Sequence, residues 1–349
     1  TAERNVFFAG ILLGISIGIR LSFALLPLPF IFIIYKNPLC RSLKEKLILI
    51  SLFFLGLLTA MLPAAILFYF SKESFIFGNF IYPGLNTLYR QESGYMNAMT
   101  IIGKFQYLKD LFLQPGNFYL LLTLAVFLPS AFIIKNSKFH YKSEILSVLV
   151  FLPFLLAGSF AATPSWYQYY YPLMPFLLLA CLYSMKTLFT VTRNRTIVLL
   201  VFFFMLFQTN LHAKFSIFNI VTEVKTAISN SSWQTMLIRA QSQEIRRITK
   251  KTKILTLAPV YSLEADNQIY KEFATGPFAF RVSHLINKEQ RNKFNIISRE
   301  ELPDLLEQDQ PKAILVGFEG YLEQEFINYA QANNYRKIIL SSGKVLYLP

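Results

Sequence analysis

The chain has 349 residues, 54% of them hydrophobic, and a formal net charge of +14. Its mean hydropathy of +0.41 is too high for an ordinary soluble globular protein of this length, so a lipid bilayer is the expected solvent. A basic excess is also typical of nucleic-acid-binding proteins, but no basic helix and no patch of mixed basic and aromatic residues accompanies it here. The composition therefore predicts a membrane protein and argues against a nucleic-acid partner.

Six apolar segments divide residues 1–212. A helix needs roughly 20 apolar residues to cross the hydrocarbon core of a bilayer, and these segments match or approach that length. In chain order they are Val6–Tyr35, Leu47–Phe70, Phe118–Ile134, Ile145–Ala162, Tyr170–Phe189 and Ile197–Leu211. We therefore expect residues 1–212 to form a membrane all-α helical bundle.

Basic residues in alternate connections predict an orientation for this bundle. Residues 1–212 carry 16 basic and 6 acidic side chains, whereas residues 213–349 carry 18 and 14. The basic connections are Lys36–Lys46, Lys135–Lys142 and Lys186–Arg195. Short connections rich in Lys and Arg stay in the cytoplasm, which predicts a multi-pass protein of the plasma membrane. The parts expected outside the cytoplasm are Ser71–Asn117, Thr163–Tyr169 and the chain after residue 212.

Arg20 interrupts the first apolar segment. A charge in such a segment costs several kcal/mol unless it pairs or reaches water, so we expect either one long tilted helix or a helical hairpin that turns at Arg20. Gly10, Gly14 and Gly18 precede it at four-residue spacing, which lets a neighbouring helix pack closely. A guanidinium group is well shaped for phosphate. Our hypothesis is that Arg20 binds the phosphate of a lipid-linked substrate, and the alternative is that it marks a turn or reaches the interface.

Tyrosine and tryptophan are concentrated in the two connections expected outside the cytoplasm. The first contains Tyr82–Gly84, Tyr89–Glu92 and Tyr95, and the second is the run Thr163–Pro172. Aromatic rings can stack on sugars, which favours a sugar-handling surface, but Trp and Tyr also anchor membrane proteins at the interface. Both interpretations stay open at this point.

The first of these connections also holds Ala98–Leu113, which is predicted to be an amphipathic helix lying on the membrane. Lys104 and Lys109 are expected on its solvated side. The acidic residues expected outside are Glu73, Glu92 and Asp110, and no two of them are adjacent. If the protein needs a general base, that base is either Glu92 or a carboxylate that this chain does not contain.

Neither a metal site nor a disulfide is predicted. Cys40 lies in a basic connection and Cys181 in an apolar segment, far apart in the sequence. His140, His212 and His284 occur singly among polar or boundary residues, where a solvated imidazole is the usual state. We therefore assign no metal ligand and no cofactor.

Residues 213–349 have the pattern of a folded, water-soluble domain. The strand-like runs are Lys253–Leu257, Ala313–Val316, Arg336–Leu340 and Lys344–Leu348. The amphipathic helical stretches are Trp233–Thr249, Ser262–Phe273, Ser298–Gln308 and Tyr321–Asn333. Strands that alternate with helices predict a small extracytoplasmic α/β domain with a partly parallel sheet. No Gly-rich phosphate loop opens these helices, so a nucleotide site has little support.

Three stretches together resemble a known family. They are Gly10–Arg20 followed by Leu26-Pro27, the aromatic and proline-rich run Tyr167–Pro175, and Ala313–Gly317 with Asn334-Tyr335 in the C-terminal domain. Their order and spacing resemble those of the polytopic glycosyltransferases of the C-type superfold. These include the family 39 protein O-mannosyltransferases and the aminoarabinose transferase of lipid A. Such enzymes carry a catalytic acidic residue in their first external loop, and this chain has no counterpart, so it resembles the C-terminal half of such a protein.

The resemblance implies transfer of a sugar from a polyprenyl-phosphate donor to a glycan, lipid or protein acceptor on the external face, by displacement at the anomeric carbon with a carboxylate as general base. It places Arg20 and Arg90 at the phosphate, which cationic groups stabilise as it leaves. Trp166, Tyr167 and Tyr169 are expected to line the donor cavity.

Two other classes of protein fit parts of the pattern. A polytopic transporter or flippase of lipid-linked substrates would account for the helices and for Arg20, but the helix block shows no internal repeat. A membrane-anchored glycan-binding protein would use residues 213–349 to bind its ligand, although five or six spans are more than an anchor needs.

Overall fold

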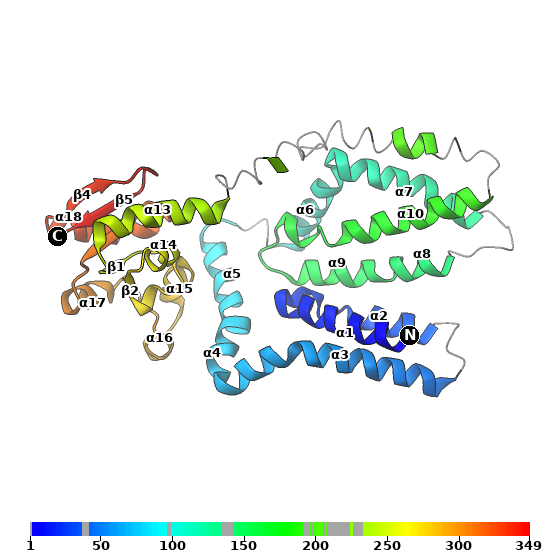
Figure 1. The fold of residues 1–349 in the computed structure, drawn as a ribbon, viewed down its shortest axis with the longest axis horizontal. Helices are drawn as coiled ribbons and strands as arrows, with labels where there is room; N and C mark the ends of the chain where they lie inside the picture. The colour runs from blue at the N-terminus through cyan, green and yellow to red at the C-terminus, as the bar shows by residue number, and fades with distance from the viewer. Residues whose placement is uncertain are drawn as a thin grey trace. The chain divides into compact units, whose positions relative to one another are not determined.

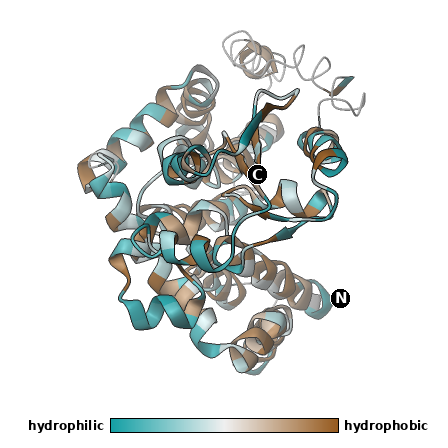
Figure 2. Cartoon of the chain, turned by 90° about the vertical axis from the view of Figure 1, so that its left-hand side faces the viewer, coloured by the Kyte–Doolittle hydropathy of each residue, from teal (hydrophilic) through white to brown (hydrophobic). Residues whose placement is uncertain are grey.

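The computed structural model describes residues 2–36, 42–95, 99–133, 142–191 and 233–349, together with residues 196, 199–204, 207 and 224–225. The chain divides into two compact units, which we call the helical unit (Thr1–Phe218) and the C-terminal unit (Asn219–Pro349). Figure 1 labels their elements. In Figure 2, brown hydrophobic residues run along the helices of the helical unit, whereas teal hydrophilic residues are mixed through the C-terminal unit.

In its described ranges, the helical unit consists of helices and single helical turns. Its elements are α1 (Ala2–Ile19), the 3₁₀ turn η1 (Leu21–Phe23), α2 (Pro27–Lys36), α3 (Leu43–Phe70), α4 (Lys72–Ile76), the π-helical turn η2 (Phe77–Ile81), α5 (Tyr82–Glu92), α6 (Ile101–Leu113), α7 (Pro115–Ile133), α8 (Lys142–Leu149), α9 (Phe151–Ala161), the 3₁₀ turn η3 (Tyr167–Tyr169) and α10 (Leu173–Val191).

Within the described residues, three helical stretches are long and apolar enough to cross a membrane, and they identify a multi-pass membrane protein. They are Leu43–Phe70, Gly116–Ile133 and Lys142–Ala161, and the shorter apolar helices are Leu21–Lys36 and Leu173–Phe189. Large apolar side chains stand exposed on their outer faces, as Leu58 does at 61%, which is the pattern of a surface that faces lipid.

The third of these spans is the apolar segment Ile145–Ala162 of the sequence, and it is divided at Val150 into α8 and α9. Pro153 accounts for the break, because it has no N–H to donate to the carbonyl of Leu149. Within the sixth predicted segment, Ile197–Leu211, the structure describes residues 199–204 and 207, and these are helical.

The glycines of α1 determine how the first segment folds. A Cβ on Gly10 would lie 2.0 Å from the carbonyl oxygen of Phe53, and one on Gly14 would lie 2.7 Å from the side chain of Ala60. From Gly10 to Gly14 along α1, the residue contacted on α3 changes from Phe53 to Ala60. The residue numbers increase in the same direction on both helices, so the two helices are parallel. The intervening α2 must therefore run back, which makes the segment a hairpin that turns at Arg20. Gly18 has no atom within 4 Å of such a Cβ, so the predicted close packing holds for Gly10 and Gly14 only.

The connection Ser71–Asn117 is folded mainly as helices, in α4, η2, α5 and α6. The expected helix Ala98–Leu113 corresponds to α6, whose Thr100 cap accepts the N–H of Gly103 at 2.9 Å. Lys109 is exposed as predicted, but Lys104 is only 6% exposed. The prediction that Lys104 is solvated is therefore wrong.

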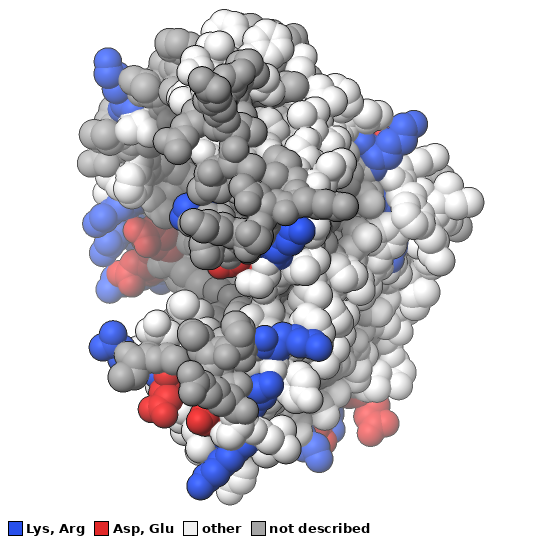
Figure 3. Space-filling model, turned by 90° about the vertical axis from the view of Figure 1, so that its right-hand side faces the viewer, with Lys and Arg blue, Asp and Glu red and all other residues white. Residues whose placement is uncertain are grey.

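The helix ends that carry basic connections lie together. Figure 1 shows the ends of α2, α7 and α10 and the starts of α3 and α8 at one end of the helical unit. Figure 3 looks onto this end, where more blue Lys and Arg than red Asp and Glu side chains are visible. Each basic connection includes residues outside the described part of the chain, namely 37–41, 135–141 and 192–195. Which face of the membrane this end occupies stays a prediction.

The C-terminal unit is an α/β fold. Its elements are α13 (Gln234–Thr249), β1 (Lys253–Leu255), α14 (Pro259–Glu264), β2 (Gln268–Ile269), η4 (Lys271–Phe273), α15 (Pro277–Val282), η5 (Ser283–Leu285), α16 (Lys288–Phe294), α17 (Leu302–Gln308), β3 (Ala313–Val316), η6 (Gly320–Glu323), α18 (Gln324–Ala332), β4 (Arg336–Ile339) and β5 (Val345–Leu348).

Its strands form a five-stranded sheet in the order β2-β1-β3-β5-β4. β1 pairs in parallel with β2 and β3, whereas β5 pairs antiparallel with β3 and β4, so the predicted partly parallel sheet is confirmed. All four residues of β3 are buried, as expected for a central strand covered on both faces. The predicted helix Ser262–Phe273 is wrong, because α14 ends at Glu264 and β2 follows.

The two edges of this sheet are short or charged. β2 has only two residues, and the outer strand β4 begins with Arg336 and Lys337, both exposed. A core cluster of the C-terminal unit contains Phe273, Phe280 and Phe326, whose ring centroids lie no more than 6.0 Å apart.

Candidate functional site

Arg20 lies where the chain leaves α1. Its N–H still donates to the carbonyl of Ser16 at 2.9 Å, but its backbone is extended, with φ −150° and ψ 108°. The chain therefore changes direction at this residue, and the η1 turn begins directly after it. The half-buried side chain is held at the end of the hairpin, where the turn leaves room for it between neighbouring helices.

The guanidinium group of Arg20 is held by the connection between α9 and α10. Nη1 donates to the carbonyl of Gln168 at 3.2 Å, and Cζ lies 4.4 Å from the ring centroid of Tyr169. A cation this close to an aromatic face is attracted by the ring. Nη2 is buried and has no hydrogen-bond partner among the described residues. One nitrogen of the fork is therefore left without an acceptor among the described residues.

A cavity of about 470 Å³ adjoins this group. Its lining residues are Arg20, Leu21, Ser22, Asn79, Pro83, Gly84, Thr87, Gly158, Ala161, Ala162, Thr163 and Tyr169. Arg20 is the charged residue of this lining, and the remaining polar groups are hydroxyls and one amide. A cavity with one cation, neutral hydrogen-bonding groups and no carboxylate in its described lining suits an anion.

Gly158 fixes the floor of the cavity by bringing α9 against η1. A Cβ at this position would lie 2.0 Å from the carbonyl oxygen of Ser22, so a larger residue would push the turn and Arg20 away. The hydroxyl of Ser159 approaches the carbonyl of Tyr169 at 2.6 Å. These contacts tie the aromatic wall of the cavity to α9.

Thr163 joins two further helices to this wall. Its Oγ1 accepts a hydrogen bond from Nζ of Lys104 at 2.9 Å, and its carbonyl oxygen lies 2.8 Å from Oγ1 of Thr87. Lys104 also donates to the carbonyl of Phe160 at 2.6 Å, near the end of α9, where unsatisfied carbonyls favour a cation. Burial lowers the pKa of the Lys104 ammonium below its ordinary value.

Arg90, Trp166 and the nearby Tyr95 form a separate group beside the cavity. Cζ of Arg90 lies 5.2 Å from the ring centroid of Tyr95, whose ring is 5.7 Å from that of Trp166. Arg90 follows Thr87 by three residues on α5, so the two side chains share one side of that helix. Neither Arg90 nor Trp166 belongs to the cavity lining.

The other two predicted site residues lie apart from the cavity as well. The ring of Tyr167 packs edge-on against that of Tyr107 at 4.7 Å, and desolvation together with the charge of Asp110 raises its pKa. Glu92 is exposed at the end of α5. Of the six residues that the sequence singled out, Arg20 and Tyr169 are the two that meet in one cavity.

Two polar residues of the cavity lining, Asn79 and Thr87, were not singled out from the sequence, whereas Pro83 belongs to the run Tyr82–Gly84 that was. Asn79, Pro83 and Thr87 line the cavity and recur at four-residue spacing, which places them on one face of a continuous helical stretch. That spacing was a usable signal. Thr163 was named only as the first residue of the aromatic run Thr163–Pro172, and its contact with Lys104 depends on the fold.

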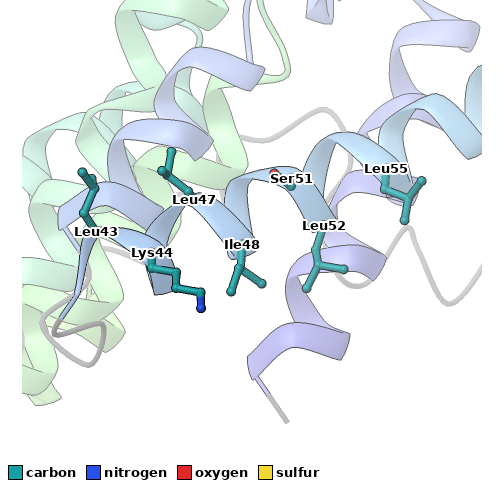
Figure 4. A pocket seen from close by; sticks show the side chains of 7 residues that line it. All are labelled: Leu43, Lys44, Leu47, Ile48, Ser51, Leu52 and Leu55. Atoms are coloured by element: carbon teal, nitrogen blue, oxygen red, sulfur yellow. The ribbon is translucent and has the colours of Figure 1, made fainter.

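A larger hollow of about 720 Å³ lies along α3 (Figure 4). It is lined by Leu43, Lys44, Leu47, Ile48, Ser51, Leu52 and Leu55. These residues belong to one helix, five of them are apolar, and the helix spans the membrane. The hollow is therefore part of the surface that faces lipid, and it carries no chemistry of its own.

No protein-family model matches the chain, and neither a curated protein nor a solved structure matches it. Within the described ranges, no three His, Cys, Asp or Glu residues are grouped so that they could hold a metal ion. The class defined by the fold is thus a multi-pass membrane protein with a small C-terminal α/β unit and a cationic cavity at one end of its helices.

Proposed function

We propose that this chain belongs to a membrane glycosyltransferase that moves a sugar from a polyprenyl-phosphate donor to an acceptor on the external face of the plasma membrane. The observation that carries the proposal is Arg20, whose buried Nη2 has no partner in the described part of the chain and which adjoins a cavity of about 470 Å³. A buried donor left without an acceptor is costly, so an anionic ligand would relieve that cost.

The cavity suits the phosphate of a lipid-linked sugar. Arg20 would neutralise the charge that grows on the phosphate as the sugar leaves, and its contact with Tyr169 holds it in place before the donor arrives. Leu21 stands 58% exposed at the rim, where a polyprenyl chain could continue into the bilayer. Both features are expected of a site that takes a charged head group from the membrane.

The general base has to come from elsewhere than the described cavity lining, which contains no carboxylate. Glu92, on the same helix as Thr87, is the candidate within this chain, and a carboxylate outside the chain is the alternative. In either case the acceptor, a glycan, a lipid or a protein, would attack the anomeric carbon while the phosphate stays bound at Arg20.

Sugar transfer by the full-length protein in lipid nanodiscs tests the proposal, with a radiolabelled polyprenyl-phosphate sugar as donor and membrane extract as acceptor. We expect Arg20→Gln to reduce transfer by about 10²-fold to 10³-fold, the range seen when a donor to a developing charge is removed. Arg4→Gln is the matched control, because Arg4 is exposed at the opposite end of α1. Normal transfer by Arg20→Gln would contradict the proposal, and substrate flux across vesicles without transfer would favour a flippase.

A further inference from the structure

The hydroxyl of Thr163 has an unused proton. Its oxygen accepts from Lys104, and the proton finds no acceptor among the described residues. A hydroxyl can accept and donate at once. Because the Lys104 ammonium donates to the Thr163 oxygen, it polarises the O–H bond and directs the hydroxyl proton away from Lys104. Thr163 lines the same cavity as Arg20, so two donors without a described acceptor, this proton and Nη2 of Arg20, belong to one cavity lining.

Lys104 is positioned by more than this one bond. Its ammonium also donates to the carbonyl of Phe160 at 2.6 Å. Its own carbonyl lies 3.3 Å from the hydroxyl of Tyr170, which is fully buried. A lysine held at both its backbone and its side chain has little freedom to turn into the cavity. Its charge therefore reaches a ligand through the Thr163 hydroxyl.

We propose that Thr163 is a second anion donor of the cavity and that Lys104 is the positioning residue that orients its hydroxyl. The ligand class is a phosphate ester with a prenyl chain, so the inference rests on the proposed function and deepens it. Arg20 then binds one phosphate oxygen through Nη2, and Thr163 donates to another. Lys104 supplies a positive charge one hydroxyl away without touching the ligand.

Binding of geranyl phosphate to the purified full-length protein tests this inference, with the uncharged alcohol geraniol as the matched ligand. Thr163→Val keeps the size of the side chain but removes the hydroxyl, and we expect it to weaken geranyl phosphate binding about tenfold, the value of one hydrogen bond to a charged group. Geraniol binding should not change. Thr163→Ser should retain the affinity of the wild type. Thr59→Val, at an exposed threonine of α3, is the control for loss of a hydroxyl.

A double-mutant cycle separates positioning from a merely structural role. We expect Lys104→Met to weaken geranyl phosphate binding about as much as Thr163→Val, and the double variant to be no weaker than Thr163→Val alone. Additive losses would show that Lys104 acts independently of Thr163 and would overturn the inference. Wild-type affinity in Thr163→Val would overturn it even if Lys104→Met failed to fold.

The outcomes also separate this inference from the proposed function. If binding depends on Arg20 but not on Thr163, the Arg20 site stands and the second donor is refuted. If the wild type binds geranyl phosphate no more tightly than geraniol, both the phosphate site and its second donor are refuted.

Discussion

The close contact between α1 and α3 allows a sharp test of the fold. In Gly10→Ala, the new Cβ would lie 2.0 Å from the carbonyl oxygen of Phe53, against 3.4 Å or more for an ordinary contact. The two helices would have to separate by about 1.4 Å. Overpacking of this kind costs about 1–3 kcal/mol, and a gap of that size removes much of the dispersion energy along the interface. We expect the free energy of unfolding to fall by about 2–3 kcal/mol.

Gly18→Ala is the matched control, because a Cβ at that position meets no atom within 4 Å. Alanine is favoured over glycine within a helix by about 1 kcal/mol, so this variant should be neutral or slightly more stable. Both variants can be compared with the wild type by reversible unfolding in mixed detergent micelles, followed by circular dichroism. If Gly10→Ala proved as stable as Gly18→Ala, the close approach of α1 to α3 at Gly10 would be refuted.

Two more predictions concern orientation and the C-terminal unit. In a background without native cysteines, Lys44→Cys should react with an impermeant maleimide only from the cytoplasmic side and Gln114→Cys only from the external side, and the reverse pattern would refute the predicted orientation. In the C-terminal unit, Arg291 holds Glu301 by two hydrogen bonds of 2.8 and 3.0 Å and lowers its pKa to about 2. Because the pKa of Glu301 in the folded protein is lower than the unfolded value of 4.5, the ionised carboxylate stabilises the folded state above pH 4.5. This contribution to the free energy of unfolding is lost as the pH falls toward 2. Glu301→Gln should therefore destabilise the unit by about 2 kcal/mol at pH 7 and progressively less below pH 4.5. Hydrogen exchange across residues 286–308 of the intact protein would measure this difference. A difference in stability that does not change with pH would contradict the prediction.

The sequence predicted those features that depend on local pattern. The apolar spans were visible from their length, and the strands β3 and β5 from short runs of apolar residues between turns. Arg20 was visible as a site candidate because a single charge inside an apolar segment needs an explanation. Whether it marked a hairpin was not visible, since the answer depends on the contacts of Gly10 and Gly14 with residues of α3 that follow them by more than forty positions.

Features that depend on distant contacts were missed for a physical reason. Lys104 follows the pattern of a solvated lysine, but the carbonyl of Phe160 and the hydroxyl of Thr163 provide its partners 56 and 59 residues away. Those partners offset the cost of burial. β2 has two residues, too few to show an alternation, and exists because it pairs with β1. In both cases a tertiary contact overrides the local preference.

The edges of the C-terminal sheet bear on how this protein behaves in a crowded membrane. Proteins confined to one bilayer keep the same orientation, so their sheet edges meet at matching heights far more often than edges of freely tumbling proteins do. An open edge strand in that setting would invite pairing between copies. Here one edge offers only two residues, and the other begins with Arg336 and Lys337, whose like charges repel an approaching copy. The short β2 and the charged start of β4 thus disfavour strand pairing between the sheet edges of neighbouring copies.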